Sequence, residues 1–180
     1  GRTISAFAEP IDGLGPLPRG AARISIHNIP PLATNRTQVS QAVKTGVRGI
    51  DIFTPICFGQ RIGIFAGSGV GKSTLLAMIA RAPHFDVAVV ALVGERGREV
   101  NEFIHDVLGD TMKKSIVVVA TGDEAPGMRK MAPILATRLA EYFRERGKKV
   151  LLIMDSVTRY AMAAREIALA AGEAPVSRGY

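Results

Sequence analysis

Cysteine, tryptophan and long apolar runs are scarce in this chain of 180 residues. Cys57 is its single cysteine, and it contains no tryptophan. One thiol excludes an internal disulfide framework and suits a reducing cytosol, and a lone cysteine with apolar neighbours is more often core filler than a nucleophile. No apolar run reaches the ~20 residues that cross a bilayer, and no signal segment opens the sequence. These absences indicate a globular domain without a membrane span or a visible export signal.

The charged residues likewise form no cluster of one sign in the sequence. The chain has 23 basic and 16 acidic residues, for a net charge of +7, and they are scattered along its length. A basic balance of this kind permits contact with an acidic surface but does not by itself indicate nucleic-acid binding. The length suits one good core and is too short for two ordinary domains. Because the chain begins with Gly1 instead of Met and stops at Tyr180 just after a loop, we expect it to be a piece of a longer protein.

Glycine, in contrast, is abundant in residues 61–80, which read RIGIFAGSGVGKSTLLAMIA. A short apolar strand, a glycine-broken loop and an apolar-striped helix form the order of a phosphate-binding P-loop. Its glycines let successive N–H groups wrap a β-phosphate, Lys72 brings a charge to the β and γ oxygens, and the Ser73 hydroxyl is placed for Mg²⁺. Ala66 stands where the usual pattern has its first glycine. The predicted nucleotide-binding residues are Gly67, Ser68, Gly69, Val70, Gly71, Lys72, Ser73 and Thr74.

Strand-like apolar runs alternate with helical patterns through most of the chain. The runs lie at residues 61–65, 86–93, 114–120 and 149–154. Such alternation indicates βαβ units, and continuous apolar runs such as VAVVALV are typical of strands buried on both faces. We therefore predict an α/β fold with a largely parallel sheet and helices on both faces. Pro133 falls in the third helical segment, so we expect that helix to begin or bend there.

The first part of the chain differs in composition. Residues 1–31 are rich in glycine and proline, with one β-like run at residues 23–29. Such composition is typical of an extended connector. We predict a connector and the end of a preceding domain at residues 1–37, followed by the α/β domain at residues 38–180.

Ligands of open parallel sheets bind beyond the carboxyl ends of the strands, so the residues that follow each apolar run are the candidate site. In GERGRE, Glu95 follows the second run, where a carboxylate can orient a water that attacks a γ-phosphate. It is equally well explained as an acid that stabilises the start of a helix. Arg96 and Arg98 carry the same ambiguity, since arginines among glutamates more often form a solvated face.

The two remaining strand ends differ in what they offer. VLLIMDS places Asp155 after an apolar strand, where a carboxylate can hold Mg²⁺, and Asp155 with Ser156 also suits a helix cap. The loop TGDEAPGMR carries Thr121, Asp123 and Glu124, which we interpret as a solvated turn more readily than as part of the site.

These motifs together resemble the ATPase subunit of the flagellar type III protein export apparatus. The likeness runs from residue 38 to 180 through GSGVGKST, GERGREV, LLIMDSVTRYAMAAREIALAAGE and the closing RGY. That group is similar in turn to the catalytic beta subunit of rotary ATP synthases, so the resemblance implies a RecA-like P-loop NTPase core. It also implies ATP and Mg²⁺ as cofactors, with Lys72, Glu95 and Arg96 catalytic, Ser73 and Asp155 at the metal, and Arg159 near the phosphates.

The resemblance further implies a setting for the protein. The expected form is a homo-oligomeric ring, a hexamer, in the cytoplasm at the inner face of the inner membrane, with export apparatus proteins, chaperones and export substrates as partners and no nucleic acid. The opening residues 1–18 are similar to the segment that leaves the family's N-terminal β-barrel. In that family the adenine-stacking aromatic and the arginine finger lie beyond the position of Tyr180, so we expect slow turnover by these residues alone.

Three alternatives stay open. A virulence-type export ATPase differs little in sequence, and the flagellar choice depends on residues 154–173, which resemble the flagellar branch more closely. A ring helicase or termination factor has the same fold, but the chain shows no aromatic and basic stripe for stacking bases. A regulatory nucleotide-binding subunit has no need of the water-activating carboxylate that Glu95 offers.

Overall fold

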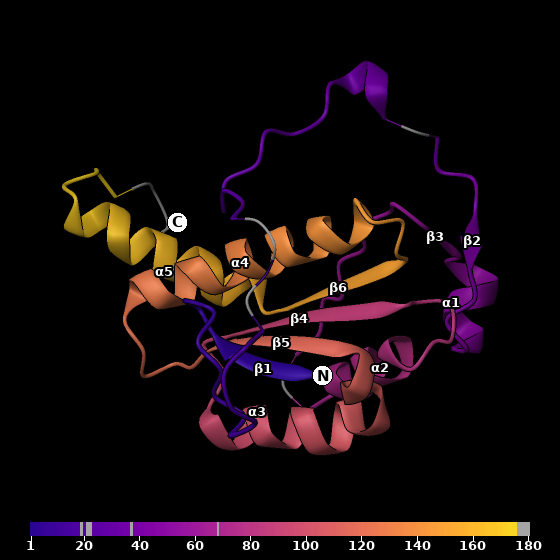
Figure 1. Cartoon of the computed structure of the whole chain (residues 1–180), viewed down its shortest axis with the longest axis horizontal. Helices are drawn as coiled ribbons and strands as arrows, with labels where there is room; N and C mark the ends of the chain where they lie inside the picture. Colours follow the sequence, from indigo (N-terminus) through magenta and orange to yellow (C-terminus); the bar gives the residue numbers. More distant parts are fainter. Residues whose placement is uncertain (19, 21–22, 37, 68, 176–180) are drawn as a thin grey trace.

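The computed structural model describes the chain except for residues 19, 21–22, 37, 68 and 176–180. Its main sheet has four parallel strands in the order β1-β5-β4-β6 (Figure 1). They are β1 (Arg2–Ser5), β4 (Val87–Val93), β5 (Ser115–Ala120) and β6 (Val150–Asp155). The strands expected at residues 86–93, 114–120 and 149–154 are therefore confirmed.

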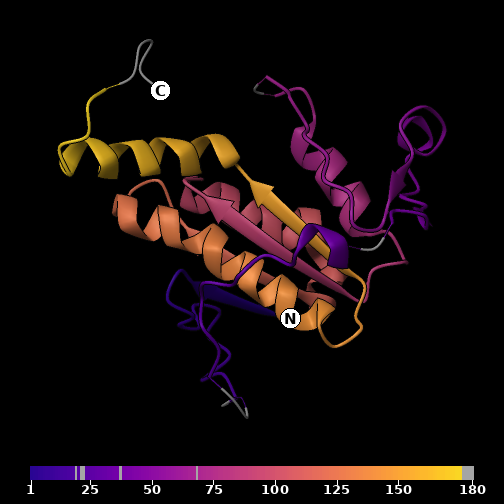
Figure 2. The same cartoon turned by 90° about the horizontal axis from the view of Figure 1, so that it is seen from above.

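Helices cover both faces of this sheet (Figure 1). One face packs against α4 (Pro126–Arg144), which lies beside α5 (Val157–Ala170) in Figure 2. The other packs against α2 (Lys72–Ala80) and α3 (Gly97–Glu102), which continues into a π-helical turn, η2 (Phe103–Leu108), and a 3-10 turn, η3 (Gly109–Lys114). The predicted α/β fold with helices on both faces is confirmed.

Strand β4 shows why its sequence is a continuous apolar run. Side chains alternate between the faces of a strand. Val89, Ala91 and Val93 join the core under α4, and Val90 and Leu92 join the core on the opposite face. All five are almost completely buried. A strand with a helix on each side has no solvent-facing position, so it carries no polar alternation.

Helix α4 reaches the sheet through small side chains. Ala132 and Ala136 are completely buried against it. The helix begins at Pro126 and contains Pro133 in its interior, so the expectation that it begins at Pro133 is wrong. Proline fits the first turn, where its missing N–H is not needed. The carbonyl of Pro133 also accepts a hydrogen bond from the Thr137 hydroxyl at 2.8 Å.

The strand expected at residues 61–65 is absent, so the P-loop follows an irregular segment. Ile62 is exposed, and Phe65 as a whole residue is 97% exposed. A strand depends on pairing with a neighbour more than on local propensity, and Gly63 removes one side chain that would anchor the run. The described part of the chain places no strand on the outer edge of β6.

The N-terminal segment also departs from expectation. Residues 23–29 form no strand, and they run beside α4, where the Asn28 amide donates to Glu141 at 2.8 Å. The strand of this segment is β1, which pairs with β5 in parallel. Its four residues, RTIS, are too short and too polar to signal a strand. The first residues of the predicted connector are thus part of the main sheet, and the division at residue 37 stays a prediction.

The remaining elements are small. An antiparallel pair of two-residue strands encloses a short helix, and a 3-10 turn precedes them. They are η1 (Ala33–Asn35), β2 (Ala42–Val43), α1 (Arg48–Phe53) and β3 (Ile56–Cys57). Among the described residues, no helix has the length and apolar character that a membrane crossing requires.

The tight contact between α4 and the sheet predicts a stability effect. Ala136→Leu inserts a larger side chain where none fits, so we expect the free energy of unfolding to fall by about 1–3 kcal/mol. Urea unfolding measures this loss. The matched control Ala161→Leu, at an exposed position of α5, should change stability by less than about 0.5 kcal/mol. Equal effects of the two substitutions would contradict the packing described here.

Candidate nucleotide-binding site

The predicted phosphate loop leads into the N-terminus of α2. Gly71 is the N-cap with φ of 96°, and Gly69 has φ of 76°. These left-handed conformations favour glycine, and a glycine N-cap brings no side chain to the first N–H groups of the helix. Such a helix start attracts anions. The loop is exposed at the predicted residues Gly67, Gly69, Val70, Gly71, Ser73 and Thr74, while Ser68 lies outside the described residues.

Lys72, the first residue of α2, forms an ion pair with Asp155. Its Nζ donates a hydrogen bond to the Asp155 Oδ1. Asp155 is the last residue of β6, and its side chain is only 6% exposed. A buried carboxylate needs a charged or hydrogen-bonded partner, and here Lys72 is that partner. The structure thus brings the P-loop lysine to the predicted metal carboxylate.

Glu95 lies beside this pair, just after β4, whose carboxyl end points the same way as that of β6 (Figure 2). Its side chain is 16% exposed, and its Oε1 lies 3.3 Å from the Nε of Arg159 in α5. Burial and a hydrogen bond with the Glu99 carboxyl raise the pKa of Glu95 to about 7. The Arg159 guanidinium opposes this rise, and the nearby charge of Asp155 adds to it.

Glu99 was not singled out from the sequence as part of this group. It is in the first turn of α3, and its hydrogen bond with Glu95 lowers the pKa of Glu99 itself. The sequence GERGRE did contain a sign of this contact, because Glu99 follows Glu95 by four residues, a spacing that brings two side chains together in a helix. The two carboxyl groups share a hydrogen bond, so they titrate as a pair.

The other predicted residues make no contact with Lys72 or Asp155 among the hydrogen bonds and ion pairs of the described residues. Arg96 is 72% exposed, and its closest partner is Glu99 at 3.7 Å, a surface ion pair of little energetic weight. Its catalytic role therefore stays a prediction. Glu124 accepts hydrogen bonds from the N–H and hydroxyl of Thr121 at 3.0 and 3.1 Å, so the loop is a turn, as expected. Ser156 is the N-cap of α5, but its side chain makes no capping hydrogen bond.

The oxygen donors at this site fit Mg²⁺. Ser73 has a hydroxyl at the start of α2 and Asp155 a carboxylate at the end of β6, and Mg²⁺ prefers such hard oxygen ligands. Mg²⁺ usually keeps several waters and takes one or two protein ligands together with phosphate. The described residues hold no cluster of three or more histidine, cysteine, aspartate or glutamate side chains suited to a metal.

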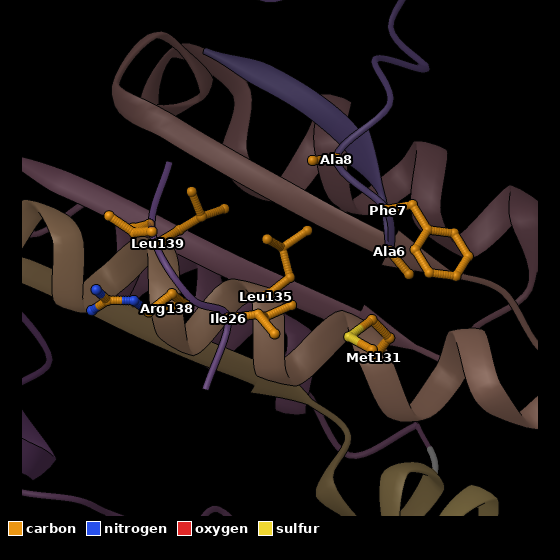
Figure 3. A pocket seen from close by; sticks show the side chains of 9 residues that line it. Ala6, Phe7, Ala8, Ile26, Met131, Leu135, Arg138 and Leu139 are labelled. Carbon is orange, nitrogen blue, oxygen red and sulfur yellow. The ribbon is translucent and has the colours of Figure 1, made fainter. Parts of the chain in front are cut away.

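An apolar cavity lies elsewhere, between α4 and the N-terminal segment. It has a volume of about 360 Å³ and lies between α4, residues 6–8, Ile24 and Ile26. Figure 3 shows that its lining is apolar apart from Arg138. The Arg138 guanidinium already donates to Glu141 at 3.1 Å and to Glu145 at 3.2 Å. This cavity offers no free charge to a phosphate, so it does not compete with the P-loop as the nucleotide site.

Comparison with known proteins assigns the family. Residues 46–180 match the model of the ATP synthase alpha/beta family, nucleotide-binding domain. The chain belongs to this family. A curated member of similar sequence, the flagellum-specific ATP synthase of Rhizobium meliloti (strain 1021), is 64% identical over 180 residues. That match covers all of this chain and 38% of the relative, so the chain spans about two fifths of its length.

Solved structures of similar sequence have the same fold. A prototypical ATPase from the type III secretion system of pathogenic bacteria superposes with a TM-score of 0.93 at 47% identity, covering 99% of this chain and 52% of the other. The assembled ATPase EscN, in complex with its central stalk EscO from enteropathogenic E. coli, superposes with a TM-score of 0.92 at 47% identity, covering 99% of this chain and 44% of the other. The resemblance to type III export ATPases is confirmed.

The environment of Glu95 predicts a pH dependence of stability. Between about pH 4.5 and 7 the folded chain holds a proton on Glu95 that the unfolded chain has released, so the free energy of unfolding falls as the pH rises through that window. Glu95→Gln removes this contribution to the slope. Urea unfolding at a series of pH values measures it, with Glu102→Gln, at an exposed position of α3, as the control that keeps the slope. Identical slopes in wild type and Glu95→Gln would contradict the burial of this carboxyl.

Proposed function

We propose that the protein hydrolyses ATP with Mg²⁺ and that this hydrolysis energises protein export through the flagellar type III secretion apparatus. The observation that carries the proposal is the position of Glu95 and Arg159 next to the Lys72–Asp155 pair. The proposed metal-binding and water-orienting groups then lie at neighbouring strand ends, beside the phosphate-binding start of α2, which suits phosphoryl transfer by positioning and electrostatics. The names of the similar proteins support the export role.

Each residue has a role in this mechanism. The N–H groups of the P-loop and the Lys72 ammonium hold the β- and γ-phosphates. Glu95 orients the attacking water in line with the γ-phosphate, and a pKa near 7 suits a group that accepts a proton at neutral pH. Arg159 places a positive charge beside that carboxylate and the phosphate end. Ser73 and Asp155 would hold Mg²⁺, which supplies neutralisation of the developing negative charge.

We infer the assembly from the family. The proposed form is a homo-oligomeric ring, a hexamer, in which residues 38–180 belong to a RecA-like ATPase domain and residues 1–37 lead from a preceding β-barrel. The structure of EscN is described as assembled and in complex with a central stalk, which supports a ring with protein partners. Proposed partners are export apparatus proteins, chaperones and export substrates, met in the cytoplasm at the inner face of the inner membrane.

The flagellar branch is favoured over its alternatives. Two flagellar relatives are 64% and 63% identical to this chain, above the 47–48% of the secretion ATPases, whereas other flagellar relatives are 46–54% identical. A nucleic-acid motor on the same fold is the remaining competitor, and RNA-stimulated hydrolysis would identify it.

Two substitutions test the roles of Glu95 and Lys72 in the full-length protein. Glu95→Gln should lower kcat by about 10²-fold or more while the affinity for nucleotide stays within about twofold, because the amide cannot accept the proton. Lys72→Ala should weaken nucleotide binding itself, because it removes the charge that meets the phosphates. Steady-state ATPase assays and calorimetric titration with ADP measure both.

The same assay, with and without single-stranded RNA, separates the candidate functions. Hydrolysis that requires Glu95 and ignores RNA supports the export motor, and Glu102→Gln should behave as wild type. Strong stimulation by RNA would favour the nucleic-acid motor instead. Turnover that persists in Glu95→Gln would make that residue a helix-start acid only.

A further inference from the structure

Gly94 lies where three parts of the chain meet. It follows the last residue of β4, has φ of 71°, and its N–H donates to the Ala120 carbonyl at the end of β5 at 2.6 Å. Arg159 of α5 and Gly122 in the turn after β5 both lie close to it. The next residue is Glu95, so the packing around Gly94 sets the backbone position from which the Glu95 side chain extends.

The Arg159 side chain uses the space that a side chain at position 94 would fill. A Cβ on Gly94 would lie 2.5 Å from the Cδ of Arg159, 3.1 Å from its Cβ and 3.3 Å from its Cγ. Carbon atoms do not approach to 2.5 Å without bonding, so Arg159 would have to move. The aliphatic stem of Arg159 thus lies across Gly94, and this path brings its Nε to 3.3 Å from the Glu95 carboxylate.

The turn after β5 also lies close to Gly94. A Cβ on Gly122 would lie 3.0 Å from the Gly94 carbonyl oxygen. The Gly122 N–H donates to the Glu95 carbonyl at 3.1 Å, which ties the turn to the backbone of the candidate base. The side chain and the main chain of Glu95 are therefore held from two different elements.

These two elements are also joined to each other through α4. The Arg129 Nε donates to the Glu124 carbonyl of the turn at 3.2 Å, and its Nη2 donates to Glu166 of α5 at 2.9 Å. Arg129 is mostly buried, whereas Glu166 is 45% exposed, so salt screens this bridge in part. A closed path of contacts therefore runs from the Glu95 carboxylate through α5, Arg129 and the turn back to the Glu95 carbonyl.

We propose that Gly94 is a positioning residue for the candidate active site. Its missing side chain lets Arg159 cross the end of β4 and hold the Glu95 carboxylate, and no residue with a Cβ permits this arrangement. The inference rests on the proposed ATP hydrolysis for its functional meaning, whereas its structural part, the placement of Arg159, stands without it.

A double-mutant cycle in the full-length protein tests this role. Gly94→Ala and Arg159→Ala should each lower kcat by a similar factor, of order 10²-fold for a misplaced group, with KM for ATP within about twofold. If Gly94 acts through Arg159, the double variant should be no slower than Arg159→Ala alone. The matched control is Gly97→Ala, since no atom lies within 4 Å of a Cβ there and the backbone is helical. It should behave as wild type.

A second variant separates the clash from backbone strain. Alanine is strained at φ of 71°, whereas asparagine tolerates the left-handed region but still brings a Cβ. Gly94→Asn should therefore unfold at a higher temperature than Gly94→Ala. Its kcat should nevertheless fall below wild type by the same factor as that of Gly94→Ala. Three results would overturn the proposal: recovery of kcat in Gly94→Asn, wild-type kcat in Gly94→Ala, or losses that multiply in the double variant.

A crystal structure of Gly94→Asn tests the placement of Arg159 without any measurement of ATP turnover. The Arg159 and Glu95 side chains should be separated well beyond hydrogen-bond distance in the variant, compared with 3.3 Å here. If the wild-type protein hydrolyses no ATP, the proposed function fails, and this separation still decides the role of Gly94. An unmoved Arg159 in the variant would overturn the proposal even if hydrolysis is lost.

Discussion

The ion pair between Lys72 and Asp155 is the interaction on which the site depends. It joins the start of α2 to the end of β6 in the main sheet. The P-loop before α2 follows an irregular segment. The pair neutralises a carboxylate that is almost completely buried. Among the described residues, Lys72 is the only cation that contacts Asp155. The pair is also the charged contact that joins the P-loop helix to the strand ends.

The parallel sheet explains why separate motifs meet at this pair. Parallel strands end at the same edge, so the residues after β4 and β6 lie together although they are far apart in the chain. That edge holds Glu95 and Asp155, and the charge of Asp155 adds to the rise in the pKa of Glu95. Lys72 and Arg159 each contribute one positive charge to them. Asp155 is therefore ion-paired with Lys72, and Glu95 has a pKa of about 7. This difference suits one carboxylate for metal binding and the other for water activation.

Sequence reasoning predicted those parts that follow from local pattern. The apolar runs of β4, β5 and β6 need only burial on both faces, and the strand-end rule then brings Asp155 and Glu95 into one region. Lys72 reaches that region from the start of α2, although the strand expected before its loop is absent. It failed where pairing or packing decides the outcome. Residues 61–65 form no strand because they pair with nothing, and β1 exists only through its pairing with β5. The contact of Arg159 with Glu95 depends on how α5 packs over Gly94, which no local pattern reveals.

The most direct test of the account is the Mg²⁺ dependence of nucleotide binding in wild type and Asp155→Asn, measured by calorimetric titration of the full-length protein with ADP. The account predicts that Mg²⁺ strengthens binding to wild type and that Asp155→Asn loses this gain while it keeps the metal-free affinity, because the P-loop and Lys72 still hold the phosphates. An Asp155→Asn variant that retains the full Mg²⁺ effect would contradict the assignment of Asp155 and, with it, the site built around the Lys72–Asp155 pair.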